Sequence, residues 1–115
     1  MIDQPERWAD VIGYEKLYRV STHGRVYSLI SDKYMSLVEH GDGYYIVKLY
    51  KNKLNHNKRV HRLVAKAFIS NENNLPMINH IDLDKKNNNI NNLEWCTTAQ
   101  NNQHYHAMKN KFGSS

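Results

Sequence analysis

The residue types best suited to chemistry lie in the last third of the sequence. His80 follows Asn79 and precedes Asp82, and Asn101 and His104 come later. A neutral imidazole can take a proton from water near neutral pH. Amide and carboxylate oxygens are ligands for hard divalent cations such as magnesium or manganese. These residues are compatible with metal-assisted hydrolysis, in which a base activates water and a cation stabilises the developing charge.

Two short strands are predicted on either side of an asparagine-rich loop. Residues 77–81 and 93–96 alternate or cluster apolar residues as strands do. The loop between them, residues 82–92, contains five asparagines. Low complexity alone would fit a flexible linker, but a position between two strands favours a functional loop braced by its own side chains.

A helix is predicted to start directly after the second strand. Thr97 is followed three residues later by Gln100, which is the capping-box pattern. The helix should therefore begin at about Thr98 and carry Asn101 in its first turn.

The N-terminal part predicts a short hairpin. Residues 17–21 and 25–29 alternate in the manner of half-buried strands, and Gly24 between them suits a three-residue turn. A small apolar lid for this sheet is expected from Trp8, Val11, Ile12 and Tyr14.

A second hairpin and a helix follow. Residues 43–51 and 58–60 are the expected strands, with a polar turn over 52–57, and helical spacing of apolar residues predicts a helix over about 61–69. His61, at the strand-to-helix junction, is expected to be structural or to touch phosphate. In the first strand Tyr45, Val47 and Leu49 are expected to face the core, and Tyr44, Lys48 and Tyr50 to face outward.

Composition narrows the class of protein. The chain has 115 residues, 16 Lys and Arg against 11 Asp and Glu, a formal net charge of +5 and a pI near 9.3. This balance favours a polyanionic partner. Cys96 is the single cysteine, which excludes an internal disulfide and a cysteine-based zinc cluster. With no apolar run of about 18 residues and no secretory signal pattern, we expect a soluble cytoplasmic protein.

The motifs together resemble the HNH endonucleases of phage homing elements. This resemblance runs over about residues 60–107 and is carried by Val60–Ile69, Asn79–Asp82, Asn87–Asn88, Asn92–Trp95, Asn101 and His104. The preceding part resembles the modular DNA-binding segment often fused to such nucleases, through Trp8, Ile12–Glu15, Tyr18–Ser21 and Gly24–Val26.

The resemblance implies an α+β protein with small antiparallel hairpins and a connecting helix, followed by a ββα-metal unit. We expect an N-terminal DNA-binding segment over 1–52, a nuclease unit over 53–110 and a flexible tail over 111–115. The expected activity is metal-dependent cleavage of double-stranded DNA, with one Mg²⁺ or Mn²⁺ and no structural zinc. A phage-encoded protein acting in a bacterial host is implied, and a dimer or a specificity partner is left open.

The resemblance also assigns roles to individual residues. His80 matches the general base, and Asn92 matches the asparagine that braces the loop bearing this histidine. Asn79 and Asn101 match the metal ligands. Aspartate is frequent at the position of Asn79, so we expect weak metal affinity here, with Asp82 as a nearby carboxylate.

Other assignments compete with these. His104, one turn after Asn101, is the rival metal ligand. A zinc site built from Cys96, His104 and His106 is not expected, because alternate residues on a helix diverge and no second cysteine is present. A DNA-binding regulator that keeps the fold without cleaving is the alternative function, favoured by Asn79. The expected DNA contacts are Arg19, Arg25, Lys48, Lys51, Lys53, Lys58 and Arg59.

Overall fold

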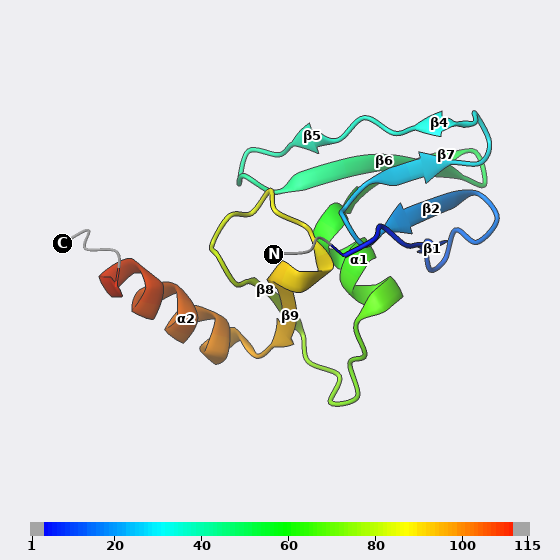
Figure 1. The fold of residues 1–115 in the computed structure, drawn as a ribbon. Coiled ribbons are helices and arrows are strands. Elements are labelled where there is room, and N and C mark those ends of the chain that lie inside the picture. The colour runs from blue at the N-terminus through cyan, green and yellow to red at the C-terminus, as the bar shows by residue number, and fades with distance from the viewer. Residues whose placement is uncertain (1–3, 112–115) are drawn as a thin grey trace.

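Three small antiparallel sheets surround one short helix in the computed structural model, which describes residues 4–111 and side chains up to residue 108 (Figure 1). The first sheet contains β1 (Trp8–Asp10), β2 (Tyr18–Ser21), β3 (Val26–Ser28) and β4 (Lys33–Tyr34), in that order. The predicted hairpin is formed by β2 and β3. Gly24 in its turn has a φ of 85°, which favours glycine because it has no Cβ.

The second sheet contains β5 (Val38–Glu39), β6 (Tyr45–Lys51) and β7 (Leu54–Arg59). Asn52 and Lys53 form a two-residue turn with φ angles of 54° and 65°, the signs found in a type I′ hairpin turn. The expected polar turn over 52–57 was therefore too long. Its later residues belong to β7. Most of the side chains of β7 are polar, so the strand shows no hydrophobic alternation from which it could be predicted.

The helix α1 (Val60–Phe68) lies at the centre of the molecule. It contacts strands of all three sheets. Val60, Val64 and Ala65 are fully buried on its inner face, while Lys66 is exposed. The predicted helix is present, one residue earlier than expected, because apolar spacing locates a helix better than its ends.

The third sheet pairs β8 (Met77–His80) with β9 (Leu93–Cys96), after a 3₁₀ turn η1 (Ile90–Asn92), and α2 (Thr98–Lys111) follows. Figure 1 shows α2 extending away from the sheets. The capping box is formed as predicted: the backbone N–H of Thr97 donates to Gln100 Oε1 over 2.9 Å, and the N–H of Gln100 donates to Thr97 Oγ1 over 3.1 Å.

One hydrophobic core joins both halves of the chain. Val20 and Val26 from the first sheet pack in the same cluster as Leu49, Val64 and Leu93. The expected boundary after residue 52 lies in the β6–β7 turn. The observed α+β fold agrees with the predicted class. Neither helix within the described residues has the length and apolar character needed to cross a membrane.

Candidate active site

A pocket of about 240 Å³ brings together three of the four predicted site residues. Asn79 and His80 reach it from β8, and Asn101 reaches it from the first turn of α2. These elements meet because α2 starts directly after β9, the partner strand of β8, and packs against β8. The remaining lining residues are Tyr44, Ile78, Leu83, Lys85, Asn102 and Tyr105.

His80 is buried, and among the described residues its ring makes one side-chain hydrogen bond. Its Nε2 lies 2.9 Å from Oδ1 of Asn88, which is itself buried. An amide oxygen only accepts, so Nε2 carries the hydrogen and donates it. In a neutral ring Nδ1 then keeps a free lone pair. Burial, the largest influence, lowers the pKa of His80 below 6.5, so the ring is neutral at neutral pH.

Asn92 braces the loop rather than touching His80. Its Nδ2 donates to Asp82 Oδ1 over 2.8 Å and to the backbone oxygen of Asn87 over 2.9 Å. Its Oδ1 accepts from the N–H of Asp82 over 3.0 Å. These bonds close the segment that directly follows His80, which is the place of the brace expected from the sequence.

Asp82 is engaged inside the same loop. Its Oδ2 accepts from Asn87 Nδ2 over 2.8 Å, and its Oδ1 accepts from Asn92 and from the N–H of Asp84. Burial acts to raise the pKa of Asp82, but these hydrogen bonds outweigh it and the pKa is lowered. Asp82 does not line the pocket. Its carboxylate therefore holds the loop, and its use as a nearby metal ligand would require those bonds to break.

Asn79 faces the pocket with one end of its amide already used. Its Nδ2 donates to Glu94 Oε1 over 2.8 Å, because the two residues are register partners on β8 and β9. No described group donates to Asn79 Oδ1. Asn101 also lines the pocket, so the two residues predicted as metal ligands are both neutral amides.

This donor set fits a weakly held hard cation. Mg²⁺ and Mn²⁺ accept amide oxygens and keep several waters, so a site with two protein oxygens needs the substrate phosphate to complete it. Within the described residues no group of three or more His, Cys, Asp and Glu side chains is arranged to hold a metal. Asn79 and Asn101 are the residues that would hold the cation.

His104 has another partner. Its Nε2 lies 2.7 Å from the backbone oxygen of Ile81 and ties α2 to the end of β8. It is not part of the pocket lining. This contact orients the helix that carries Asn101, which is a use for His104 that does not involve a metal.

Tyr44 corrects an expectation. It was expected to face outward, but its ring lies against His61 and His80, with centroids 4.9 Å and 5.7 Å away. Cations of Arg59 and Lys85 lie over the same ring at 4.9 Å and 5.0 Å. Tyr44 precedes the first paired residue of β6, so strand alternation does not set its direction.

His61 completes an aromatic cluster with Tyr44 and His80. The centroids of the two imidazole rings are 5.1 Å apart, and Nδ1 of His61 is buried with no hydrogen-bond partner among the described residues. Burial first, then the neighbouring His80, lowers the pKa of His61 to about 3. Its surroundings are those of a neutral, structural histidine.

Two of the seven expected DNA contacts donate hydrogen bonds to carboxylates. Arg25 donates from Nε and Nη2 to Glu6 over 2.8 Å and 2.6 Å. This pairing lowers the pKa of Glu6 to about 2. Arg59 Nη2 donates to Asp42 Oδ2 over 2.7 Å. To bind phosphate, each guanidinium group would have to contact it in addition to the carboxylate or give up the carboxylate.

Four of the other five expected contacts lie on the β6–β7 hairpin. Lys51 and Lys58 lie over the Tyr14 ring at 5.6 Å and 5.9 Å, on the core side. Lys48 is exposed on the opposite face, and Lys53 is exposed in the turn. The remaining member, Arg19, is exposed and 3.6 Å from Asp10.

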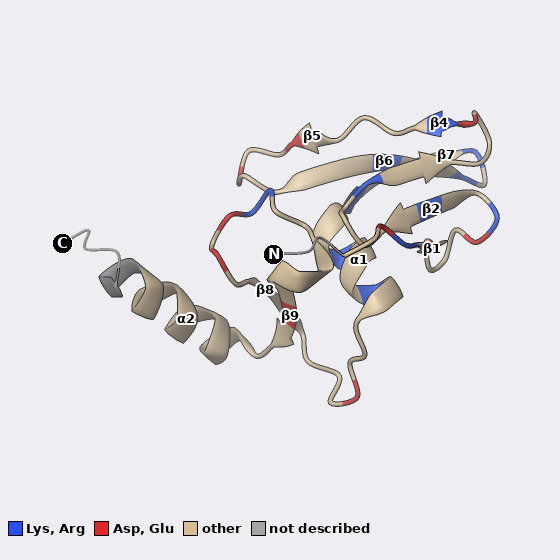
Figure 2. Ribbon diagram, viewed as in Figure 1, with Lys and Arg blue, Asp and Glu red and all other residues tan. Residues whose placement is uncertain are grey.

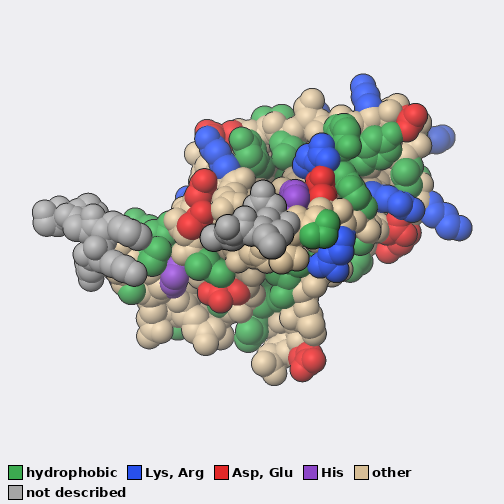
Figure 3. Space-filling view, in the orientation of Figure 1, with side chains coloured by type: hydrophobic (Ala, Val, Ile, Leu, Met, Phe, Trp, Pro, Cys, Tyr) green, Lys and Arg blue, Asp and Glu red, His purple; other side chains and the backbone are tan. Residues whose placement is uncertain are grey.

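Figure 2 shows Lys and Arg positions mainly along the first two sheets and α1, and Figure 3 shows their side chains mainly on the same part of the visible face. Lys85, which was not predicted as a contact, lines the His80 pocket itself. Its place in an asparagine-rich loop gave no sequence signal for this role. The basic surface thus includes one cation beside the candidate site.

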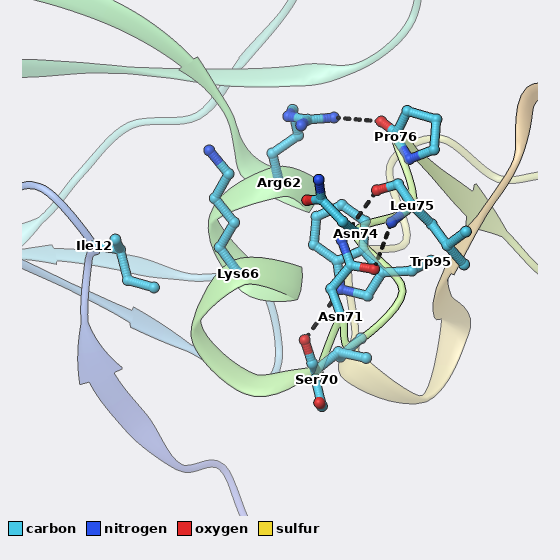
Figure 4. Close-up of a pocket in the computed structure, with 10 residues that line it drawn as sticks. Ile12, Arg62, Lys66, Ser70, Asn71, Asn74, Leu75, Pro76 and Trp95 are labelled. Atoms are coloured by element: carbon cyan, nitrogen blue, oxygen red, sulfur yellow. Dashed lines mark hydrogen bonds between the residues drawn. The ribbon is translucent and has the colours of Figure 1, made fainter.

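A second hollow of about 540 Å³ lies away from His80 (Figure 4). It opens between α1, the segment 70–76 and Trp95. Arg62 lies over the Trp95 ring at 5.9 Å and points toward Pro76, while Lys66 points away from them. Trp95 is half-buried and donates from Nε1 to the Ile69 oxygen over 3.0 Å. This hollow holds none of the predicted site residues.

Fold and site together define a two-part α+β protein with a histidine and amide pocket in a strand, strand and helix unit. Comparison with known proteins agrees with both parts. The NUMOD4 motif matches residues 6–50, and the HNH endonuclease family matches residues 58–103. The chain belongs to the HNH endonuclease family.

Relatives come from viruses and phages. An uncharacterized HNH endonuclease of Acanthamoeba polyphaga mimivirus is 45% identical over 94 residues, covering 82% of this chain and 28% of the relative. The DNA endonuclease I-HmuI of Bacillus phage SP01 is 38% identical over 94 residues, covering 82% of this chain and 54% of the relative. This chain therefore spans about a quarter to about half the length of these relatives.

A solved structure agrees with the fold. The structure titled "DNA binding and cleavage by the HNH homing endonuclease I-HmuI" superposes with a TM-score of 0.80 at 38% identity, covering 89% of this chain and 60% of that one.

Proposed function

We propose that this chain is a metal-dependent endonuclease that hydrolyses phosphodiester bonds in double-stranded DNA. The observation that carries the proposal is the pocket in which His80 lies beside Asn79 and Asn101. There His80 Nε2 donates to Asn88, and Nδ1 is the nitrogen left to act as a base. The name of the similar structure, which describes DNA binding and cleavage, supports the same activity.

In this mechanism Nδ1 of His80 takes a proton from a water molecule. The hydroxide oxygen forms a bond to phosphorus, and the bond from phosphorus to the leaving oxygen breaks. A neutral ring is required for the first step, and burial of His80 favours that form. Nε2 keeps its hydrogen and goes on donating it to Asn88 Oδ1, so the ring does not rotate as it becomes charged.

Asn79 and Asn101 would hold one Mg²⁺ or Mn²⁺. The bound cation would stabilise negative charge on the phosphate and on the leaving oxygen. Lys85 at the pocket and the exposed cations Lys48 and Lys53 would hold the DNA backbone. We expect the protein to cleave DNA inside the host cell of a phage or virus, because the relatives described above come from a phage and a giant virus.

A nicking assay on supercoiled plasmid, with Mg²⁺ or with a chelator, tests the proposal. The parent should produce relaxed circles or linear DNA only with the metal. His80→Ala should cleave about 10² to 10⁴ times more slowly, the usual worth of a positioned base, while binding DNA as the parent does. Parental cleavage by His80→Ala would remove His80 from the mechanism.

The rival function is a DNA-binding regulator that does not cleave. It is favoured by Asn79, whose neutral amide stands where a carboxylate would attract a cation more strongly. The same assay separates the two: tight DNA binding without any metal-dependent nicking would identify the regulator.

A further inference from the structure

The turn between β2 and β3 packs directly on the asparagine-rich loop. The backbone N–H of Ile90 donates to the Thr22 oxygen over 2.8 Å. Thr22 is fixed in turn by two bonds to Arg7: its N–H donates to the Arg7 oxygen, and its Oγ1 accepts from the Arg7 N–H. A segment within the NUMOD4 match is therefore bound to a segment within the HNH match.

Gly24 in this turn makes the closest approach to Asn88. A Cβ added at Gly24 would lie 2.9 Å from the Asn88 Cβ and 3.2 Å from the Asn88 backbone oxygen. Distances under 3.0 Å are not tolerated between such atoms, so a side chain at Gly24 would force the turn and Asn88 apart. The absence of a side chain is what lets Asn88 lie where it does.

The other end of Asn88 reaches His80. Its Oδ1 accepts from His80 Nε2 over 2.9 Å, and both residues are buried. The partner of one ring nitrogen decides which nitrogen carries the hydrogen and how the ring is oriented. Gly24, Asn88 and His80 thus form a continuous series of contacts from the N-terminal sheet to the pocket.

We propose that Gly24 and Asn88 are positioning residues for His80: the β2–β3 turn fixes the Asn88 amide, which holds His80 with its hydrogen on Nε2 and its lone pair on Nδ1. The inference rests on the proposed function, in which Nδ1 is the base. It gives the N-terminal segment a part in the chemistry in addition to any contact with DNA.

Two glycine substitutions provide a matched test. Gly24→Ala and Gly13→Ala both place a Cβ on a left-handed backbone, at φ angles of 85° and 89°, so the conformational penalty is similar. Only Gly24 has atoms in the way, because nothing lies within 4 Å of a Cβ at Gly13. Any difference between the variants reports the displacement of Asn88.

With saturating DNA and Mg²⁺, Gly24→Ala should cleave about 10 to 100 times more slowly than the parent, because small displacements of a reacting group have effects of this size. The DNA concentration for half-maximal rate should not change. Gly13→Ala should cleave within about twofold of the parent, since the series of contacts is intact. Equal rates for the two variants would overturn the proposal.

Nitrogen-15 NMR of the His80 ring in metal-free protein gives a readout that does not depend on activity. The parent and Gly13→Ala should show a protonated Nε2 and an unprotonated Nδ1, and Gly24→Ala should lose this preference. Asn88→Ala should lose it as well, while Asn88→Asp, which keeps an acceptor oxygen, should retain it. If Gly24→Ala does not fold, the two Asn88 variants decide the matter.

The two proposals fail differently. Parental cleavage by His80→Ala would reject the base assignment, whatever the glycine variants do. An inactive His80→Ala, together with a parental tautomer in Asn88→Ala, would reject the positioning role alone.

Discussion

The contact between Asn79 and Glu94 predicts an unusual response to Asn79→Asp. In the parent, Asn79 Nδ2 donates to a Glu94 carboxylate oxygen over 2.8 Å. The substitution removes a hydrogen bond to a charged group and places a second carboxylate against the first. Loss of the bond costs about 1.5–3 kcal/mol. Repulsion between the two carboxylates adds to this cost, but solvent weakens it because Glu94 is exposed. In chelator, the free energy of unfolding should therefore fall by about 2–4 kcal/mol.

Metal should reverse this loss. A carboxylate at position 79 attracts a divalent cation more strongly than an amide does, and the positive charge of the cation offsets the repulsion between the two carboxylates. We expect Asn79→Asp to cleave at or above the parental rate, with half-maximal activity at a lower Mg²⁺ concentration. Its unfolding midpoint should rise with Mg²⁺ by more than that of the parent, because ligand binding stabilises the folded state.

The measurement is urea unfolding in chelator and across a Mg²⁺ series, with nicking rates alongside. The matched control is Asn79→Asp combined with Glu94→Gln, in which the glutamine amide donates to the new carboxylate and restores the bond with its direction reversed. This double variant should recover most of the stability in chelator. If Asn79→Asp alone is as stable as the parent without metal, the contact with Glu94 contributes nothing. An equal response to Mg²⁺ would remove Asn79 from the metal site.

Three further predictions concern other parts of the site and surface. Asn101→Ala should raise the Mg²⁺ concentration needed for half-maximal cleavage while leaving DNA binding in chelator unchanged. His104→Ala should mainly destabilise α2. If Mg²⁺ titrations show the raised concentration for His104→Ala and not for Asn101→Ala, His104 is the ligand. The folded state holds His61 neutral with a pKa of about 3, whereas the unfolded chain takes up a proton below about pH 6.5. The free energy of unfolding should therefore fall as pH drops below about 6.5, by at most about 1.4 kcal/mol per pH unit from this group. In urea unfolding at several pH values, His61→Phe should show a smaller dependence of this free energy on pH. Metal-free DNA binding should weaken steeply between low and moderate salt because Lys and Arg contacts release counterions, and an affinity that does not change with salt would contradict the basic-surface proposal.

Local signals in the sequence predicted most of the elements. The capping box at Thr97 located the start of α2, and apolar spacing located α1, because each depends on residues three or four positions apart. Hydrophobic alternation in β6 correctly placed Val47 and Leu49 inside. It found only the end of β7, expected over 58–60, because most of residues 54–59 are polar and exposed. The pairing partner, rather than the strand's own pattern, makes that segment a strand.

The contacts that organise the pocket were beyond this kind of reasoning. Five asparagines within six residues have the same side chain and no periodicity, so their own pattern does not say which one meets His80. Only the family resemblance singled out Asn92 as the brace of the loop. Tertiary contacts separate them: Asn88 lies under Gly24 and against His80, whereas Asn92 bonds to Asp82. The same holds for Tyr44, whose position depends on two histidines far along the chain.

These contacts explain how a pocket with little negative charge could still do metal-assisted chemistry. His61 and His80 are both kept neutral by burial, so neither repels a cation near Asn79 and Asn101. Asp82 is committed to the loop, and Glu94 stands behind Asn79 rather than in the pocket. In the proposed site, binding of the cation would then depend on the phosphate of the DNA. Metal affinity and DNA affinity should accordingly be coupled, which would limit cleavage to the moment when DNA occupies the site.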